Sequence, residues 1–120
     1  MLVVEDDVRN VFALTSLLEP RGMRVVIARN GKEALTAVER ESSIDLVLMD
    51  LMMPEMDGLE ATRELRKDPR WSKLPIIALT AKAMRDDQEQ CLAAGANDYV
   101  AKPFDVEMLL SLLRVWMPKR

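Results

Sequence analysis

The chain of 120 residues contains no histidine and one cysteine, Cys91. Histidine is the commonest general base and the commonest transition-metal ligand in proteins, so its absence argues against a Ser-His-Asp hydrolase and a histidine-based zinc enzyme. A single cysteine permits neither an internal disulfide nor a Cys-x-x-Cys motif. The composition therefore fits a reducing, cytoplasmic setting and chemistry that relies on oxygen ligands.

Long apolar runs and clusters of positive charge are also missing. No apolar run approaches the roughly 20 residues that span a bilayer, and the first residues do not have the layout of a signal peptide. The formal net charge is −3, and the 17 lysines and arginines are scattered along the chain. These features argue against a membrane span and against binding of nucleic acid, which leaves proteins or small molecules as the expected partners.

Short apolar runs alternate with segments of helical period. The runs predict strands at Leu2–Glu5, Arg24–Ala28, Asp45–Met49, Pro75–Leu79 and Asp98–Ala101. A helix is expected after each strand, the last two over about 84–94 and from about Val106. The pattern predicts one domain, residues 1–120, with an α/β flavodoxin-like doubly wound five-stranded parallel sheet (order 2-1-3-4-5) and five helices.

Three helical segments carry further expectations. The first is predicted to begin at an N-cap, Asp7, and the second at another, Asn30. Residues at three- and four-residue steps predict one apolar stripe on the first helix: Val8, Val11, Phe12, Leu14, Leu17 and Leu18. Cys91, in the fourth segment, is expected to be a small buried residue.

Polar residues follow the strands at the ends where this fold places its functional groups. They are Glu5, Asp6 and Asp7 after the first strand, Asp50 after the third, Thr80 after the fourth and Lys102 after the fifth. Carboxylates held close together repel unless they share a cation, and Mg²⁺ is the natural candidate. An acid beside Mg²⁺ is suited to attack phosphorus, while a lysine and a hydroxyl stabilise the phosphoryl oxygens. The sequence therefore predicts that Asp50 is a phosphoryl acceptor.

Four blocks give the chain a resemblance to a known family over nearly its whole length. They are VVEDD, LVLMDLMMPEMDG, PIIALTA and AGANDYVAKPF, and in this order and spacing they resemble a response-regulator receiver domain of two-component signalling. The resemblance implies that Asp50 accepts a phosphoryl group from a phosphohistidine on a histidine kinase or a histidine phosphotransfer protein. It also implies that Glu5, Asp6, Asp50 and the backbone carbonyl of Met52 bind Mg²⁺.

The same resemblance implies a switch. Thr80 would turn its hydroxyl toward the phosphoryl group, Lys102 would pair with that group, and Tyr99 would rotate inward. The surface made by the helix over 84–94, the strand at 98–101 and the helix from Val106 would then change, and this surface is the candidate for a dimer contact. The bond between Lys102 and Pro103 is expected to be cis, which an X-Pro bond permits at a cost of about 0.5–1 kcal/mol.

Two further positions follow from the family pattern. Met52 and Lys82 stand where the family tunes hydrolysis of the aspartyl phosphate. Because Met52 offers no group to orient a water molecule, we predict a phosphoryl lifetime longer than that of fast-cycling receivers. Glu5 replaces the first acid of the family's pair, and its longer arm is expected to reach the ion through water, while Asp6 is expected to be a direct ligand.

The parent protein is also suggested by resemblance. The segments VRNVFALTSLLEPRGM, LTAKAM and LLRVWMPKR look most like receivers attached to hybrid sensor histidine kinases, so the chain is expected to be excised from such a protein. An isolated receiver is expected to phosphorylate and dephosphorylate itself and to catalyse nothing else.

Three other functions remain open from the sequence. A Mg²⁺-dependent phosphohydrolase of haloacid-dehalogenase type also uses an aspartyl nucleophile, but that family has Asp-x-Asp after its first strand, where this chain has Glu5-Asp6-Asp7. A receiver that has lost phosphorylation would serve only as a docking surface. A flavin- or nucleotide-binding domain shares the scaffold, yet the chain has no glycine-rich phosphate loop.

Overall fold

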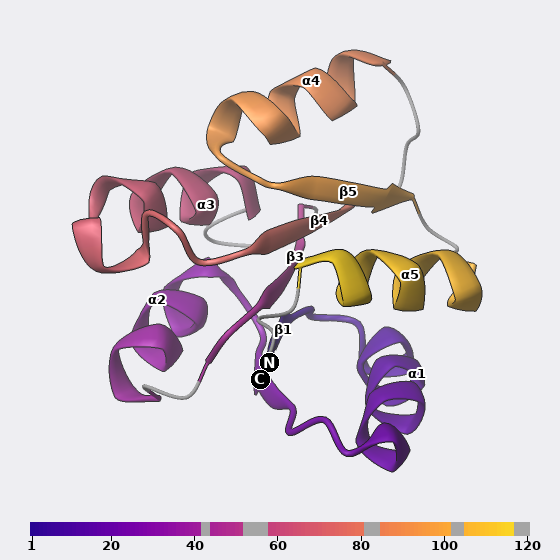
Figure 1. Ribbon diagram of the computed structural model, residues 1–120. Coiled ribbons are helices and arrows are strands. Elements are labelled where there is room, and N and C mark those ends of the chain that lie inside the picture. The colour runs from indigo at the N-terminus through magenta and orange to yellow at the C-terminus, as the bar shows by residue number, and fades with distance from the viewer. Residues whose placement is uncertain (42–43, 52–57, 81–84, 102–104, 117–120) are drawn as a thin grey trace.

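The computed structural model describes residues 1–41, 44–51, 58–80, 85–101 and 105–116, without the side chains of 85–88. These residues form one parallel sheet of five strands in the order β2-β1-β3-β4-β5, with helices on both faces (Figure 1). The strands are β1 (Leu2–Val4), β2 (Val26–Ala28), β3 (Val47–Asp50), β4 (Ile76–Thr80) and β5 (Asp98–Ala101). The predicted fold class and strand order are confirmed.

The described residues also form five α-helices and two short 3-10 helices. The α-helices are α1 (Val8–Leu18), α2 (Gly31–Arg40), α3 (Gly58–Lys67), α4 (Arg85–Ala94) and α5 (Val106–Trp116). The 3-10 helices are η1 (Glu19–Arg21) and η2 (Pro69–Trp71). No helix in the described ranges is long and apolar enough to cross a membrane.

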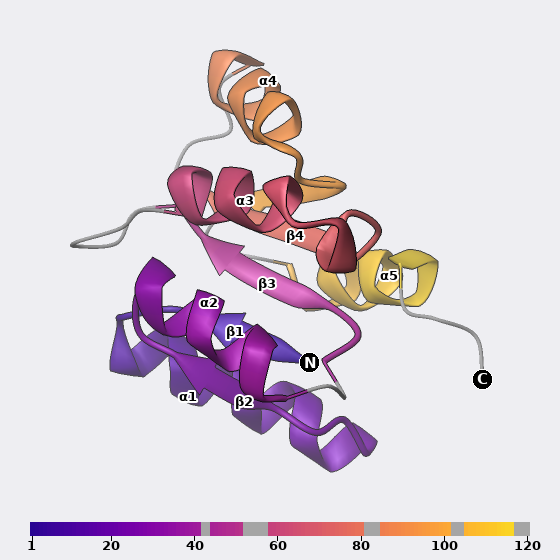
Figure 2. The ribbon, with the colours of Figure 1, turned by 90° about the vertical axis from the view of Figure 1, so that its left-hand side faces the viewer.

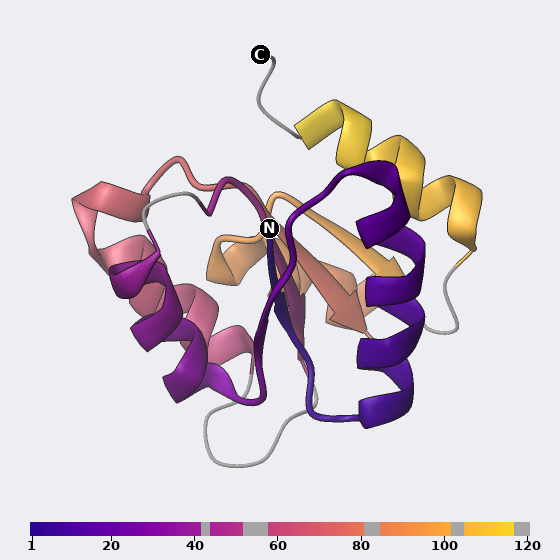
Figure 3. The same cartoon turned by 90° about the horizontal axis from the view of Figure 1, so that it is seen from below.

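The sheet lies between two layers of helices. Figure 3 shows α1 and α5 on one face and α2 and α3 on the other, and Figure 2 shows α2 and α3 in front of the sheet. The first face packs on Leu14 and Leu18 of α1 and on Leu109 and Leu113 of α5. The second face packs on apolar residues of α2, α3 and α4: Ala34, Val38, Ala61, Leu65 and Cys91. Cys91 is buried, as predicted.

Both predicted N-caps are confirmed. Asp7 accepts a hydrogen bond from the backbone N–H of Arg9 at 2.9 Å, and Asn30 accepts one from the backbone N–H of Glu33 at 2.9 Å. Each bond satisfies an N–H group that a first helical turn leaves without an intrahelical partner. The cap at Asp7 makes α1 begin two residues after Asp6, which keeps Asp6 next to the end of β1.

The apolar stripe predicted for α1 is only partly correct. Leu14 and Leu18 are buried, but Val8 is 69% exposed and Phe12 is 71% exposed. The period of 3.6 residues places Val8 and Phe12 to the side of the face that carries the two leucines. Two large apolar side chains therefore face solvent on the first half of α1.

Because the strands are parallel, their last residues meet at one end of the sheet. Asp50 ends β3, Thr80 ends β4, and Glu5 and Asp6 follow β1. We call this end the carboxyl end of the sheet, and the opposite end, where the strands begin, the amino end. The carboxyl end is where functional groups lie in folds of this type.

Candidate functional site

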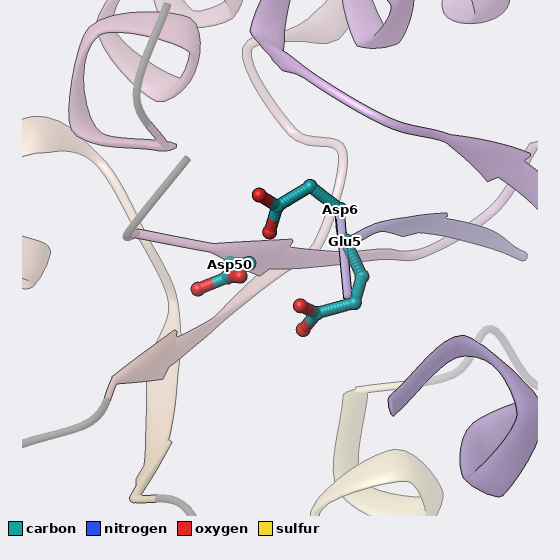
Figure 4. Close-up of side chains that lie close together, drawn as sticks. All are labelled: Glu5, Asp6 and Asp50. Atoms are coloured by element: carbon teal, nitrogen blue, oxygen red, sulfur yellow. The ribbon is translucent and has the colours of Figure 1, made fainter. Parts of the chain in front are cut away.

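Three carboxylates meet at the carboxyl end of the sheet. Glu5 and Asp6 follow β1, and Asp50 ends β3, which pairs directly with β1. One carboxylate oxygen of each residue lies within 4.8 Å of those of the other two (Figure 4). Glu5 and Asp50 are each 1% exposed, whereas Asp6 is exposed. The sheet thus brings together the three acids that the sequence singled out.

Three negative charges at this separation repel one another. Two unit charges about 4 Å apart interact by about 1 kcal/mol in water and about 4 kcal/mol at an effective dielectric constant near 20. A hard divalent cation with oxygen ligands removes this repulsion, and all three donors here are carboxylate oxygens. The residues present therefore fit Mg²⁺.

Glu5 is held by the backbone that follows it. Its side-chain oxygen Oε1 accepts a hydrogen bond from the backbone N–H of Asp7 at 3.2 Å, and its own N–H donates to the carbonyl of Ala28 at 2.9 Å. The carboxylate is thereby fixed next to Asp6 at the end of β1.

Asp7 caps α1 and is not part of the carboxylate cluster. Its carboxylate lies 3.1 Å from the guanidinium of Arg9. Hydrogen bonds from the side chain and backbone of Arg9 lower the pKa of Asp7 below its usual value. Within the described residues, the acids whose oxygens lie close enough to share an ion are Glu5, Asp6 and Asp50.

A hydroxyl group lies at the end of the neighbouring strand. Thr80 is 4% exposed and ends β4, and Leu79, the residue before it, pairs with Asp50 in the sheet. Tyr99 lies in β5 opposite Ala78 and is half-buried on the face covered by α2, α3 and α4. Thr80 is therefore one step beyond the strand partner of Asp50, and Tyr99 lies farther along the sheet.

Four of the predicted site residues lie outside the described residues. These are Met52, Lys82, Lys102 and Pro103. Their expected roles, including the backbone carbonyl of Met52 as a ligand and the cis bond before Pro103, stay predictions from the family pattern.

Gly58 is a close neighbour of Asp50 that the sequence indicates only as a turn residue. Gly58 is buried at the start of α3, and a Cβ atom placed on it would collide with the main-chain carbonyl oxygen of Asp50. In the sequence, Asp57-Gly58 is most simply a turn and a helix start. A glycine's need for space depends on what packs against it, which a single sequence does not reveal.

Comparisons with known proteins agree with this arrangement. Residues 1–114 match the family model of the response regulator receiver domain. The chain is 39% identical to the protein PilH of Pseudomonas aeruginosa over 113 residues, which covers 94% of this chain and 93% of PilH.

Solved structures of receiver domains are also similar to this chain. The receiver domain of a sensor histidine kinase of Pseudomonas aeruginosa, solved with a magnesium ion in its active-site cleft, is 43% identical with a TM-score of 0.87, over 96% of this chain and 93% of that one. The receiver domain of the Saccharomyces cerevisiae response regulator Ssk1, solved with the histidine phosphotransfer protein Ypd1, is 30% identical with a TM-score of 0.90, over 97% of this chain and 86% of that one. The strand order, the acidic cluster and these likenesses together show that the chain belongs to the response regulator receiver domains of two-component signalling.

Proposed function

We propose that Asp50 accepts a phosphoryl group from a phosphohistidine on a partner, with Mg²⁺ bound by Glu5, Asp6 and Asp50. The observation that carries the proposal is the convergence of these three carboxylates at the carboxyl end of the sheet. Asp50 is the most suitable acceptor because it ends a strand that is paired on both sides, by β1 and by β4. The magnesium ion in the active-site cleft of the similar histidine kinase receiver supports the choice of metal.

The proposed transfer forms one bond and breaks another. A carboxylate oxygen of Asp50 attacks the phosphorus, and the bond from phosphorus to the partner's imidazole nitrogen breaks, with its electron pair left on the nitrogen. Mg²⁺ at this site would offset the charge of the carboxylates and of the phosphoryl oxygens. Thr80 is proposed to donate a hydrogen bond to a phosphoryl oxygen, Lys102 to pair with the group, and the carbonyl of Met52 to complete the ligand set.

Intact mass spectrometry tests the proposal directly. The protein is incubated with Mg²⁺ and acetyl phosphate, with the Asp50→Asn variant alongside. The wild type should gain one phosphoryl increment that hydroxylamine removes, and the variant should gain none, because an acyl phosphate forms only on the carboxylate. An increment that persists in Asp50→Asn would contradict the assignment.

The same preparation tests the role proposed for Met52. The loss of the phosphoryl increment is followed after acetyl phosphate is removed. We expect slow hydrolysis, since an apolar side chain at this position gives no hydrogen bond to an attacking water. A half-life of seconds would contradict the proposal, and Met52→Asn, which restores a polar group, should shorten the lifetime.

The proposed switch links Thr80 to the surface of α4, β5 and α5. Tyr99 lies two residues before the end of β5, where an inward rotation of its ring would change this surface. The Tyr99→Ala variant should still gain the phosphoryl increment. Hydrogen exchange of α4, β5 and α5 should respond to phosphorylation in the wild type and not in the variant, and an unchanged response in the variant would contradict the switch role.

A histidine kinase or a histidine phosphotransfer protein is the proposed partner, and the first half of α1 is the proposed contact. Support for the partner comes from the Ssk1 receiver solved with Ypd1. Support for the contact comes from the exposed side chains of Val8 and Phe12 on the helix that begins two residues after Asp6. Arg9 is a poor test, because it pairs with the cap residue Asp7. Phe12→Ser should slow transfer from a phosphorylated partner while phosphorylation by acetyl phosphate stays unchanged, and equal loss of both would argue against the contact.

A further inference from the structure

The first turn of α3 touches the main chain of the proposed phosphoryl acceptor. An ideal Cβ atom on Gly58 would collide with the carbonyl oxygen of Asp50 and would lie 2.9 Å from the carbonyl carbon of Asp50 and 2.9 Å from Cα of Leu51. All three atoms belong to the main chain, so no side chain can move aside to make room. The positive-φ glycines among the described residues are Gly22 and Gly95, so Gly58 is required for space and not for its backbone conformation.

A buried hydroxyl holds this turn in place. Thr62 is 2% exposed, and its Oγ1 donates a hydrogen bond to the carbonyl of Gly58 at 2.6 Å. Ala61 and Leu65, on the same helix, are fully buried in the cluster that contains Met49, the residue before Asp50. The helix is therefore fixed to β3 by apolar packing, and the Thr62 hydroxyl bonds within its first turn, to the carbonyl of the glycine that lies against the end of that strand.

We infer that Gly58 and Thr62 are positioning residues for the phosphoryl acceptor. The main chain of Asp50 lies between the sheet on one side and the first turn of α3 on the other, so the contact at Gly58 sets the place from which the Asp50 carboxylate extends. That place decides whether its oxygen lies near those of Glu5 and Asp6. Neither positioning residue contributes an oxygen to the carboxylate cluster, and the inference rests on the function proposed for Asp50.

Mg²⁺ binding by isothermal titration calorimetry tests the inference with a matched glycine as control. Gly58→Ala should weaken Mg²⁺ binding by about tenfold or more, in line with the effect of residues that support metal ligands. Gly22→Ala strains the backbone instead, at a φ of 81°, while its Cβ would have nothing within 4 Å, and Gly22 follows η1. This control should lower the free energy of unfolding and leave Mg²⁺ affinity unchanged. A folded Gly58→Ala protein that binds Mg²⁺ within about twofold of the control would overturn the inference.

A second pair of variants decides the matter if Gly58→Ala does not fold. Thr62→Val keeps the shape and removes the hydroxyl, whereas Thr62→Ser keeps the hydroxyl and removes a buried methyl group. Both should lower the free energy of unfolding, but only Thr62→Val should weaken Mg²⁺ binding and slow phosphorylation by acetyl phosphate. Equal Mg²⁺ affinity in the two variants would overturn the inference. Wild-type protein that binds Mg²⁺ and gains no phosphoryl increment would contradict the proposed function alone, because the binding comparison would still stand.

Discussion

At the carboxyl end of the sheet, groups of like charge lie close together and repel one another, whereas at the amino end the positive charge of an arginine is hydrogen-bonded to several uncharged oxygens. At the carboxyl end, three carboxylates lie within 4.8 Å, an arrangement that favours binding of a cation over the stability of the empty fold. At the amino end, the guanidinium of Arg66 ties the end of α3 to the chain that enters β5.

The network at the amino end includes main-chain and side-chain acceptors. Arg66 donates to the carbonyl of Gly95 at 2.9 Å, to the carbonyl of Trp71 at 2.7 Å and to Oδ1 of Asn97 at 2.8 Å. Asn97 in turn accepts from the backbone N–H of Ile76 at 2.8 Å and donates its own N–H to the carbonyl of Ile76 at 2.7 Å. Burial, which removes part of the hydration of the Arg66 guanidinium, lowers the pKa of this group.

The difference suggests that stability and chemistry are divided between the two ends. Changes at the amino end should alter the free energy of unfolding and leave Mg²⁺ binding intact. Changes among the carboxylates should weaken Mg²⁺ binding and raise the free energy of unfolding of the metal-free protein. Variants at the two ends of the sheet test this division.

Arg66→Met should cause the largest loss of stability. The variant keeps most of the apolar stem of the side chain but removes the donor from three acceptors, of which two are main-chain carbonyls. We expect the free energy of unfolding to fall by about 2–3 kcal/mol, measured by urea denaturation. Arg63→Met, on the exposed face of the same helix, is the matched control and should change little. A loss no larger than that of the control, or a change in Mg²⁺ affinity, would break the division.

Gly95→Ala should come next. Gly95 has a φ of 118°, and a Cβ atom there would lie 2.5 Å from Cγ of Arg66. Backbone strain and the displaced arginine together should cost about 2 kcal/mol, compared with about 1 kcal/mol for Gly22→Ala, which has strain alone. If the two effects share Arg66, the double variant Gly95→Ala with Arg66→Met should lose less than the sum of the single variants. Additive losses would show that Gly95 acts without Arg66.

The fold and the acidic cluster were predictable because each leaves a local pattern. Apolar runs alternate with helical segments, and short polar side chains stand at the starts of α1 and α2, where Asp7 and Asn30 cap them. Because parallel strands end at the same side of a sheet, the topology alone brings Asp50 to Glu5 and Asp6.

What the sequence could not predict depends on packing between distant segments. Arg66 looks like any solvated arginine on a helix, since its acceptors lie on η2 and beyond the end of α4. Gly58 looks like a turn residue, because its contact with Asp50 exists only in the folded chain. Phe12 fits an apolar stripe, yet the face of α1 that meets the sheet is set by Leu14 and Leu18, which leaves Phe12 exposed.

Asp6→Asn should raise the stability of the metal-free protein, whereas Arg66→Met and Gly95→Ala should lower it. Removing one of three like charges should raise the free energy of unfolding by about 1 kcal/mol in EDTA. In Mg²⁺ the order should reverse, because the wild type gains stability by binding the ion and the variant binds it weakly. Asp105→Asn is the matched control: it removes a charge from the N-cap of α5, where asparagine caps equally well. A Mg²⁺-dependent gain in stability equal to that of the wild type would remove Asp6 from the ligand set.

Trp116→Phe should give the smallest effect. It tests whether a hydrogen bond from α5 also contributes to the stability of the amino end. The indole Nε1 of Trp116 donates to Oδ2 of Asp98 at 3.2 Å, which ties the last turn of α5 to the first residue of β5. Asp98 also accepts from the backbone N–H of Tyr99 at 2.9 Å, so its carboxylate keeps a partner in the variant. The loss should therefore be about 0.5–1 kcal/mol. Trp71 then remains as the single tryptophan, and its fluorescence in a urea titration reports the transition. The carbonyl of Trp71 also accepts a bond from Arg66, so the double variant of Trp116→Phe with Arg66→Met tests whether the two contacts are coupled. If its loss of stability equals the sum of the two single losses, α3 and α5 are fixed to the amino end independently. If its loss is smaller than that sum, both contacts act through the start of β5.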